Sequence, residues 1–244
     1  MSRSTKILQA TRRLCNELEP LSFAAPITHI YNPLIYARKP HETYIKRYAD
    51  SKKRVLLMGM NPGPFGMAQT GVPFGEVTLV RDWLDIDAPV DKPDNEHPKR
   101  PVQGFACPKS EVSGRRLWGT IAEHFTTPNA FFKDHFVANY CPLVFMEESS
   151  RNRTPDKLPA AEKDPLFAAC DRALLGLIKA LEPQWVIGIG AFVEARIMAA
   201  CKTLLDNDAL QIGRILHPSP ASPLANKDWA GTAKKQLCKL GVCL

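Results

Sequence analysis

The sequence lacks the cysteine spacings that hold metal clusters or disulfide frameworks. Its seven cysteines are odd in number, and no CxxC pair occurs among them. This excludes a zinc ribbon, an iron–sulfur cluster and a secreted disulfide-rich domain in their usual forms. We expect instead reduced and mostly buried thiols in an intracellular protein.

Long apolar runs are also missing. No segment approaches the length of a membrane span, and residues 1–20 have no apolar core of the kind that a signal peptide needs. Residues 1–20 predict a short amphipathic helix instead. We therefore expect a soluble protein with no membrane partner.

The glycine-rich stretch GMNPGPFGMAQTGVPFGEV (59–77) lacks the motifs of nucleotide-binding loops. It has no GK[ST] ending, and its glycines do not follow the GxGxxG spacing. The chain also offers no Ser–His–Asp order and no zinc-binding cluster. A nucleotide hydrolase is therefore disfavoured.

Size and charge give only broad indications of what is present. With 244 residues and 45% hydrophobic composition, the chain can bury a sizeable core as one domain. The net charge of +7 and the pI of about 9.1 favour an anionic partner. Nucleic acid is the commonest such partner, although ordinary soluble enzymes also carry a modest basic excess.

Four apolar runs have strand character and alternate with helical patterns. The predicted strands are 54–60, 136–145, 184–190 and 210–217. The predicted helices are 112–125, 164–183, 191–205 and 222–241. Nearly unbroken apolar strands that alternate with helices indicate a parallel α/β sheet covered on both faces. The alternation continues across two long loops, so we predict a single domain over 1–244, with a helical extension of about 25 residues at its N-terminus packed on it.

Polar residues follow these strands at one edge of the predicted sheet. In an open parallel sheet, ligands bind beyond the carboxyl ends of the strands. Asn61 follows the first run, Asn139 lies within the second, and His217 ends the fourth. Each also has an ordinary structural interpretation, since Asn before Pro-Gly is a common turn former and a lone His is usually not a catalyst. Their coincidence on one rim, and the prolines that stiffen two of the motifs, favour a preorganised site.

The chemistry of these residue types suits a planar ring that leaves as an anion. An asparagine amide has fixed donors and an acceptor that can match the edge of such a ring or orient a water. A histidine can donate to a developing anion. Phe65 and Phe74 could supply a stacking face, although a Phe in an apolar loop is more often part of the core. Uracil is a leaving group of this kind.

Two long motifs, 59–77 and HPSPASPLANKDW (217–229), together resemble the single-strand-selective monofunctional uracil-DNA glycosylases. Further segments similar to that family are RDWL (81–84), EHPKRPV (96–102), CPKSEVSGRR (107–116), NYCPL (139–143) and RNRTP (151–155). The resemblance implies the uracil-DNA glycosylase fold, a three-layer α/β/α sandwich with a central four-stranded parallel sheet. It also implies hydrolysis of the N-glycosidic bond of uracil, and of uracils modified at C5, as the first step of base excision repair, without a metal or other cofactor.

The resemblance assigns a role to each motif residue. Asn61 would position the attacking water, and His217 would donate to uracil O2 as the base leaves. Phe74 would stack on the base, and Asn139 would pair with its N3–H and O4 edge. Gly63 would leave room at C5, and the backbone of Met60 and Gly63 would complete the pocket wall. How thymine is refused is not visible in the sequence.

The segment after HPSP would hold the DNA and fill the space of a flipped base. Here this chain departs from the family, which often has Arg followed by Asn where Ala221 and Ser222 stand. Ala221 is too small to fill a vacated base position, so Leu224 or another neighbour would have to do so. We expect further DNA contacts from Lys109, Ser113, Gly114, Arg115, Ser219, Ala221, Ser222, Pro223, Leu224 and Lys227.

Two alternatives remain at this point. One is a glycosylase of the same superfamily that acts substantially on deaminated purines such as hypoxanthine or xanthine. The other is a non-catalytic binder of single-stranded DNA, which would explain the basic charge but not Asn61, Asn139 and His217 together. We expect a monomer whose partner is uracil-containing DNA, single- or double-stranded.

Overall fold

The structure, a computed structural model, describes residues 1–202 and 210–242. Its centre is a four-stranded sheet in the order β3-β2-β6-β7, in which every neighbouring pair is parallel. The strands are β2 (Val55–Gly59), β3 (His135–Asn139), β6 (Trp185–Ile189) and β7 (Gln211–Ile215). The four-stranded parallel sheet inferred from the apolar runs is therefore confirmed.

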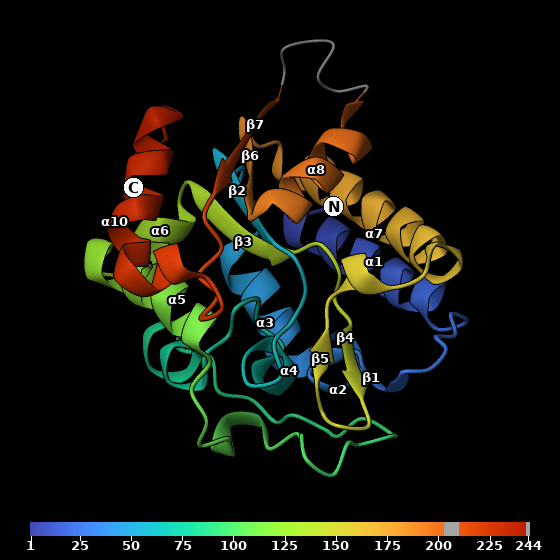
Figure 1. Ribbon diagram of the computed structural model, residues 1–244. Helices are drawn as coiled ribbons and strands as arrows, with labels where there is room; N and C mark the ends of the chain where they lie inside the picture. Colours follow the sequence, from blue (N-terminus) through green and yellow to red (C-terminus); the bar gives the residue numbers. More distant parts are fainter. Residues whose placement is uncertain (203–209, 243–244) are drawn as a thin grey trace.

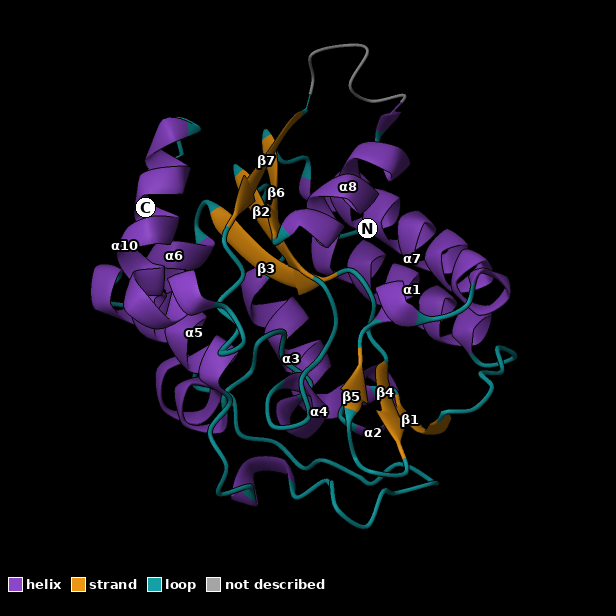
Figure 2. Cartoon of the chain, in the orientation of Figure 1, coloured by secondary structure: helices purple, strands orange, loops and turns teal. Residues whose placement is uncertain are grey.

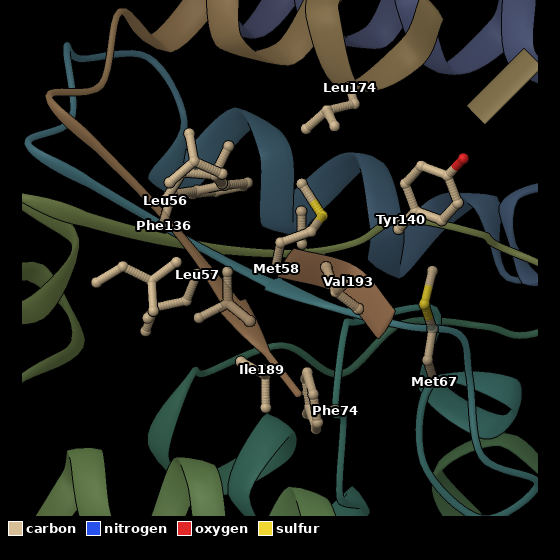
Figure 3. Packing of buried hydrophobic residues seen from close by; sticks show 14 of the residues in the cluster. Leu56, Leu57, Met58, Met67, Phe74, Phe136, Tyr140, Leu174, Ile189 and Val193 are labelled. Atoms are coloured by element: carbon tan, nitrogen blue, oxygen red, sulfur yellow. The ribbon is translucent and has the colours of Figure 1, made fainter. Parts of the chain in front are cut away.

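Both faces of this sheet are covered, which explains why its strands are apolar at successive positions. All five residues of β2 are buried. Successive side chains of a strand point to opposite faces, and Figure 3 shows Leu56 and Leu57 on opposite sides of the sheet. Each strand therefore contributes to two packed layers.

The helices form one layer on each side of the sheet (Figure 1). On the Leu57 side lie α5 (Val112–His124) and α10 (Pro223–Lys239). On the side of Met58 and Phe136 lie α1 (Arg3–Leu18), α3 (Arg38–Tyr48), α7 (Ala160–Leu181) and α8 (Ala191–Ala200), of which α8 packs on α7 and on β6. This is the predicted α/β/α sandwich.

The predicted helices differ from the observed ones mainly at their ends. Ser222 caps α10 by accepting from the Ala225 N–H, and Pro223 occupies the first turn, where its missing N–H costs nothing. The helix α7 begins at Ala160, four residues ahead of the predicted start, and Pro165 lies within its first two turns. The helix α8 ends at Ala200, and the predicted continuation over 203–205 lies outside the described residues.

The prediction of one strand over 136–145 is wrong. Instead, β3 ends at Asn139 and a separate strand, β4 (Val144–Glu147), begins after a turn. Pro142 in this turn has no N–H to donate to a ladder, and it interrupts the apolar run. The strand β4 joins β1 (Ile27–Tyr31) and β5 (Asn152–Arg153) in a second, antiparallel sheet of order β1-β4-β5, which Figure 2 shows apart from the central one.

Short elements fill the remaining connections. They are α2 (Pro33–Tyr36), α4 (Met67–Thr70), α6 (Pro128–Phe132), the π-helix η1 (Leu79–Trp83) and the 3-10 helices η2 (Gly104–Ala106) and η3 (Pro155–Lys157). In the described part of the chain, none of the helices is both long enough and apolar enough to cross a membrane.

The N-terminal helix α1 packs along α7. Its buried side chains, among them Leu14 and Leu18, join the same hydrophobic cluster as the strands of the central sheet. The organisation of 1–244 as one domain stays a prediction, since residues 203–209 and 243–244 lie outside the description.

Candidate active site

A cavity of about 360 Å³ opens at the carboxyl end of the central sheet. Its walls come from the segments that follow β2, β3 and β7 and from the start of α5. The lining residues are Met60, Asn61, Pro62, Gly63, Phe74, Glu111, Ser113, Asn139, Asn152, Thr154, His217 and Ser219. The structure thus brings together every residue that we predicted to be catalytic or to bind the base.

The order of the strands explains why the cavity lies here. The chain passes from β2 to β3 on one side of β2, and it then returns to form β6 on the other side. Connections that leave in opposite directions open a crevice at the carboxyl ends of the strands, which is where open α/β sheets bind ligands. The cavity is therefore a consequence of topology as well as of side chains.

The Asn61 side chain is oriented by the turn after β3. Its Nδ2 donates to the Leu143 carbonyl at 3.1 Å, with a longer contact of 3.5 Å to the Pro62 carbonyl. The same turn is attached to the end of β2, because the Cys141 N–H donates to the Met60 carbonyl at 2.9 Å. With its amide hydrogens used in this way, Asn61 keeps Oδ1 as an acceptor for a group in the cavity.

The Asn139 side chain lies at the adjacent strand end, where Gly59 leaves the space that it needs. A Cβ atom on Gly59 would stand 2.4 Å from Asn139 Oδ1 and 2.4 Å from the Phe74 ring, so no side chain fits at that position. Asn139 Nδ2 contacts Met67 Sδ at 3.3 Å, while Oδ1 is buried and has no hydrogen-bond partner among the residues that the structure describes. A buried acceptor without a partner is costly, and it is a feature that a ligand donor would relieve.

Phe74 is held in a conformation that few bulky residues adopt. Its φ is +53° and its side chain is only 7% exposed. Trp118 Nε1 donates to the preceding Pro73 carbonyl at 3.0 Å, and the backbone of Phe74 packs so closely on Gly114 that a Cβ there would lie 2.1 Å from the Phe74 carbonyl oxygen. Strained backbone of this kind is concentrated at functional sites.

His217 faces Phe74 across the cavity, with ring centroids 6.1 Å apart. Within the described chain, neither imidazole nitrogen has a hydrogen-bond partner, so both are available to a ligand. Burial lowers the pKa of His217 to about 4. The imidazole is therefore neutral at physiological pH and can act as a neutral hydrogen-bond donor.

The loop that carries His217 is fastened to the start of α5. Arg116 donates to the carbonyls of Pro218 and Ser219 at 3.1 and 3.3 Å and to Asn226 Oδ1 at 2.9 Å. Asn226 in turn donates to the Pro220 carbonyl at 2.9 Å, which closes the loop on itself. This clamp fixes the geometry of the whole segment between β7 and α10.

The predicted DNA contacts lie in this loop, in the first turns of α10, and in and just before α5. Lys109, Arg115, Ala221, Pro223 and Lys227 are exposed, Ser219 is half-buried, and Leu224 is 63% exposed on the first turn of α10. The Ser222 hydroxyl caps α10 by accepting from the Ala225 N–H, and the Gly114 N–H donates to Glu111 Oε2 at 3.1 Å. The buried Ser113 hydroxyl donates to the Pro218 carbonyl at 3.4 Å.

Sequence reasoning missed four residues of the site. Asn152 and Thr154 line the cavity from β5 and the residues after it, and Glu111 lines it from the start of α5. Arg116 does not line it but holds the loop that does. Glu111 could have been noticed as a lone acidic residue directly ahead of a predicted helix in a basic stretch. No sequence pattern indicated that β5 would lie next to the cavity.

Comparisons with known proteins agree with this geometry. A model of the uracil DNA glycosylase superfamily matches residues 45–238. The chain is 48% identical over 235 residues to a single-strand selective monofunctional uracil DNA glycosylase of Bos taurus, covering 96% of this chain and 86% of that protein. It is equally similar, at 48%, to the protein of the same name from Mus musculus, covering 96% of this chain and 84% of that protein.

A solved structure has the same fold. The crystal structure of SMUG2 from Pedobacter heparinus superposes with a TM-score of 0.66, covering 99% of this chain and 97% of that one. The two sequences are only 16% identical, so this likeness concerns the fold alone.

Proposed function

The chain belongs to the single-strand selective monofunctional uracil DNA glycosylases, within the uracil DNA glycosylase superfamily, and from this premise we propose that it hydrolyses the N-glycosidic bond of uracil in DNA. The product is an abasic site for base excision repair. The observation that carries the proposal is the convergence of Asn61, Asn139, Phe74 and His217 on one cavity.

Asn61 positions the water that attacks the sugar. Its amide hydrogens are engaged by backbone carbonyls, chiefly that of Leu143, so Oδ1 is left to accept a hydrogen bond from the water. A neutral amide is a poor base, and its contribution is therefore orientation rather than proton abstraction. The water oxygen bonds to C1′ and gives its proton to solvent.

His217 stabilises the departing base. The bond between C1′ and uracil N1 breaks with its electron pair going to the base, and charge accumulates on the ring oxygens. A neutral imidazole that donates to O2 would lower the barrier by ~3 kcal/mol, as single donors of this type do in other enzymes. The lowered pKa of His217 supports this role. A neutral imidazole is not drawn into an ion pair with a DNA phosphate and so stays in the cavity.

Asn139 and Phe74 recognise the base. The unpartnered Asn139 Oδ1 would accept from uracil N3–H, while Nδ2 would donate to O4. Cytosine reverses both groups and would leave buried polar atoms unpaired. Phe74 stacks on the ring, and Gly63 leaves room for substituents at C5, so that C5-modified uracils also enter.

DNA binds across the mouth of the cavity. Leu224 is large, apolar and 63% exposed at the start of α10, so we assign to it the filling of the space that a flipped base vacates, in place of the small Ala221. Exposed cations at 109, 115 and 227 contact phosphates. Both single- and double-stranded DNA are substrates of a monomeric, intracellular enzyme that needs no cofactor.

The test is strand cleavage, after alkali, of a labelled oligonucleotide with a single uracil. We expect cleavage at the uracil only, by the wild type and not by Asn61→Ala, and none in an otherwise identical thymine strand. A wild-type protein that binds this DNA but leaves it intact would contradict the proposal and favour the non-catalytic binder.

A further inference from the structure

A carboxyl group stands in the wall of the cavity beside Gly63. Glu111 lines the cavity, and its two oxygens rest against glycines of the loop after β2. A Cβ atom on Gly63 would lie 2.6 Å from Glu111 Oε1, and one on Gly66 would lie 2.5 Å from Oε2. Only glycines at these positions allow the carboxyl to sit so close to the loop.

The two oxygens of Glu111 have different surroundings. Oε2 accepts from the Gly114 N–H at 3.1 Å and so caps α5. Oε1 has no hydrogen-bond partner among the described residues, and no Lys, Arg or His of the described chain forms an ion pair with Glu111. The helix needs one of these oxygens, and the other is left at the Gly63 side of the cavity.

We propose that Glu111 is a specificity-determining residue that selects bases with a hydrogen-bonding group at C5 over bases with a methyl group there. The inference rests on the proposed function, which puts the C5 side of the base at Gly63. A hydroxyl or hydroxymethyl group at C5 can hydrogen-bond to Glu111 Oε1. The methyl of thymine would cover Oε1 without giving it a partner, which disfavours thymine.

The surroundings of Glu111 favour a neutral carboxyl. Burial raises its pKa to about 7, against the opposing effect of the Gly114 N–H, and the charge of Glu76 raises it further. The loop 60–66 that packs on Glu111 has no titratable residue. Across the cavity, His217 is neutral because burial lowers its pKa to about 4. On its own segment, Lys109 and Arg115 are exposed.

Specificity is tested with Glu111→Met, which keeps the length of the side chain and removes both oxygens. The readout is the ratio of kcat/KM for 5-hydroxymethyluracil to that for thymine in the same oligonucleotide. We expect this ratio to fall at least about tenfold, the effect of one hydrogen bond to such a group. Glu123→Met, an exposed residue of the same helix, is the matched control and should leave the ratio unchanged.

Glu111→Gln tests the same role without removing the helix cap, because its amide oxygen can accept from Gly114. As pH rises from 6 to 8.5, Glu111 ionises next to a base that departs as an anion. The wild-type kcat/KM for uracil should therefore fall by up to about tenfold per pH unit above 7, and that of Glu111→Gln should not. This profile shows whether Glu111 lies beside the departing base. If Glu111→Met fails to fold, the hydroxymethyluracil-to-thymine ratio is measured with Glu111→Leu, which also removes both oxygens.

The outcomes separate the two proposals. A wild type that leaves uracil intact overturns the proposed function. A wild type that excises uracil overturns only the role of Glu111 in two cases: if Glu111→Met keeps the hydroxymethyluracil-to-thymine ratio, or if Glu111→Gln has the same pH profile as the wild type.

Discussion

Two walls of the cavity are built in different ways. On the sheet side, Asn61 and Asn139 lie at the ends of neighbouring parallel strands. The N–H groups of the two residues after Asn139 donate to the carbonyls of Gly59 and Met60, which fixes the separation of the two strand ends. On the loop side, the segment from His217 to Lys227 is positioned by side chains, chiefly Arg116. The positions of the groups proposed for base recognition are thus fixed by backbone hydrogen bonds of the sheet. The positions of those proposed for DNA binding are fixed by a few side-chain hydrogen bonds.

This difference predicts where substitutions are tolerated. Exchanging an exposed residue such as Ala221 for another changes no packing, because the loop is closed by Arg116 and Asn226 instead. At Gly59 no exchange is possible without displacing Asn139 and Phe74. Substitutions on the sheet side and at His217, which lines the cavity, should therefore have large effects on turnover. Those at the exposed loop residues should have small effects on DNA binding.

The largest effect is expected from His217→Ala and Asn61→Ala. Each should lower single-turnover excision of uracil by about 10²- to 10³-fold, the usual result of removing one preorganised group. Both sites are half-buried and neither makes the core, so the melting temperature should change little. A variant with wild-type turnover would remove that residue from the chemistry.

Phe74→Leu should have the next largest effect. Leucine keeps the apolar contact with the core but loses the flat face, and stacking of a base on an aromatic ring contributes ~1–3 kcal/mol. We expect a loss of about tenfold in kcat/KM for uracil. Phe65→Leu in the same loop, outside the cavity lining, is the control. If Phe74→Leu lowers only thermal stability, the stacking role is wrong.

Leu224→Ala should affect duplex substrates more than single strands. A single-stranded uracil needs no extrusion, while a paired one must be replaced in the stack. The predicted loss is about fivefold on duplex DNA and less than twofold on single strands, because an exposed wedge offsets only part of the ~1–3 kcal/mol of unstacking. Met198→Ala, a similarly exposed residue on α8, should change neither. Equal losses on both substrates would argue against a wedge.

The fold was largely predictable because the strands are buried on both faces. The run 54–60 contains β2, and the four runs together contain the central sheet except for His135, the first residue of β3. The error at 136–145 arose because β3 and β4 are both apolar, and hydrophobicity cannot tell which sheet a strand joins. The strand β1 and helix α3 were not predicted, since a short strand with a polar middle and a helix rich in charge and containing Pro40 have weak patterns.

The site was predictable only where it depends on strand ends. The rule that ligands bind at the carboxyl edge found Asn61, Asn139 and His217 from their sequence positions alone. The stacking role of Phe74 could be predicted only from the resemblance to the family, because the residues alone left Phe65 and Phe74 as equal candidates. Glu111, Asn152 and Thr154 reach the cavity through loops whose paths depend on tertiary packing, and no local pattern encodes that approach.

The pH dependence of stability should reveal the burial of His217. Its folded pKa of about 4 lies below the unfolded value of 6.5, so between these values the unfolded chain binds the proton more readily. This group's contribution is present above pH 6.5 and is lost as pH falls towards 4, by at most ~1.4 kcal/mol per pH unit. Urea unfolding at several pH values should show this slope in the wild type, reduced in His217→Gln. Equal slopes would mean that the imidazole is solvated.

The smallest effect is expected at the exposed cation Arg115 of α5. Arg115 is exposed in the first turn of α5, and we assign it a phosphate contact. Arg115→Gln should weaken binding uniformly across sequences and reduce the slope of log K against log salt by about 1. Turnover at saturating DNA should stay the same, because the residue does not line the cavity. Lys235→Gln, an exposed cation of α10, should leave the slope unchanged. If both variants reduce the slope equally, the positive charge acts through the overall electrostatic field of the protein, and Arg115 makes no specific phosphate contact.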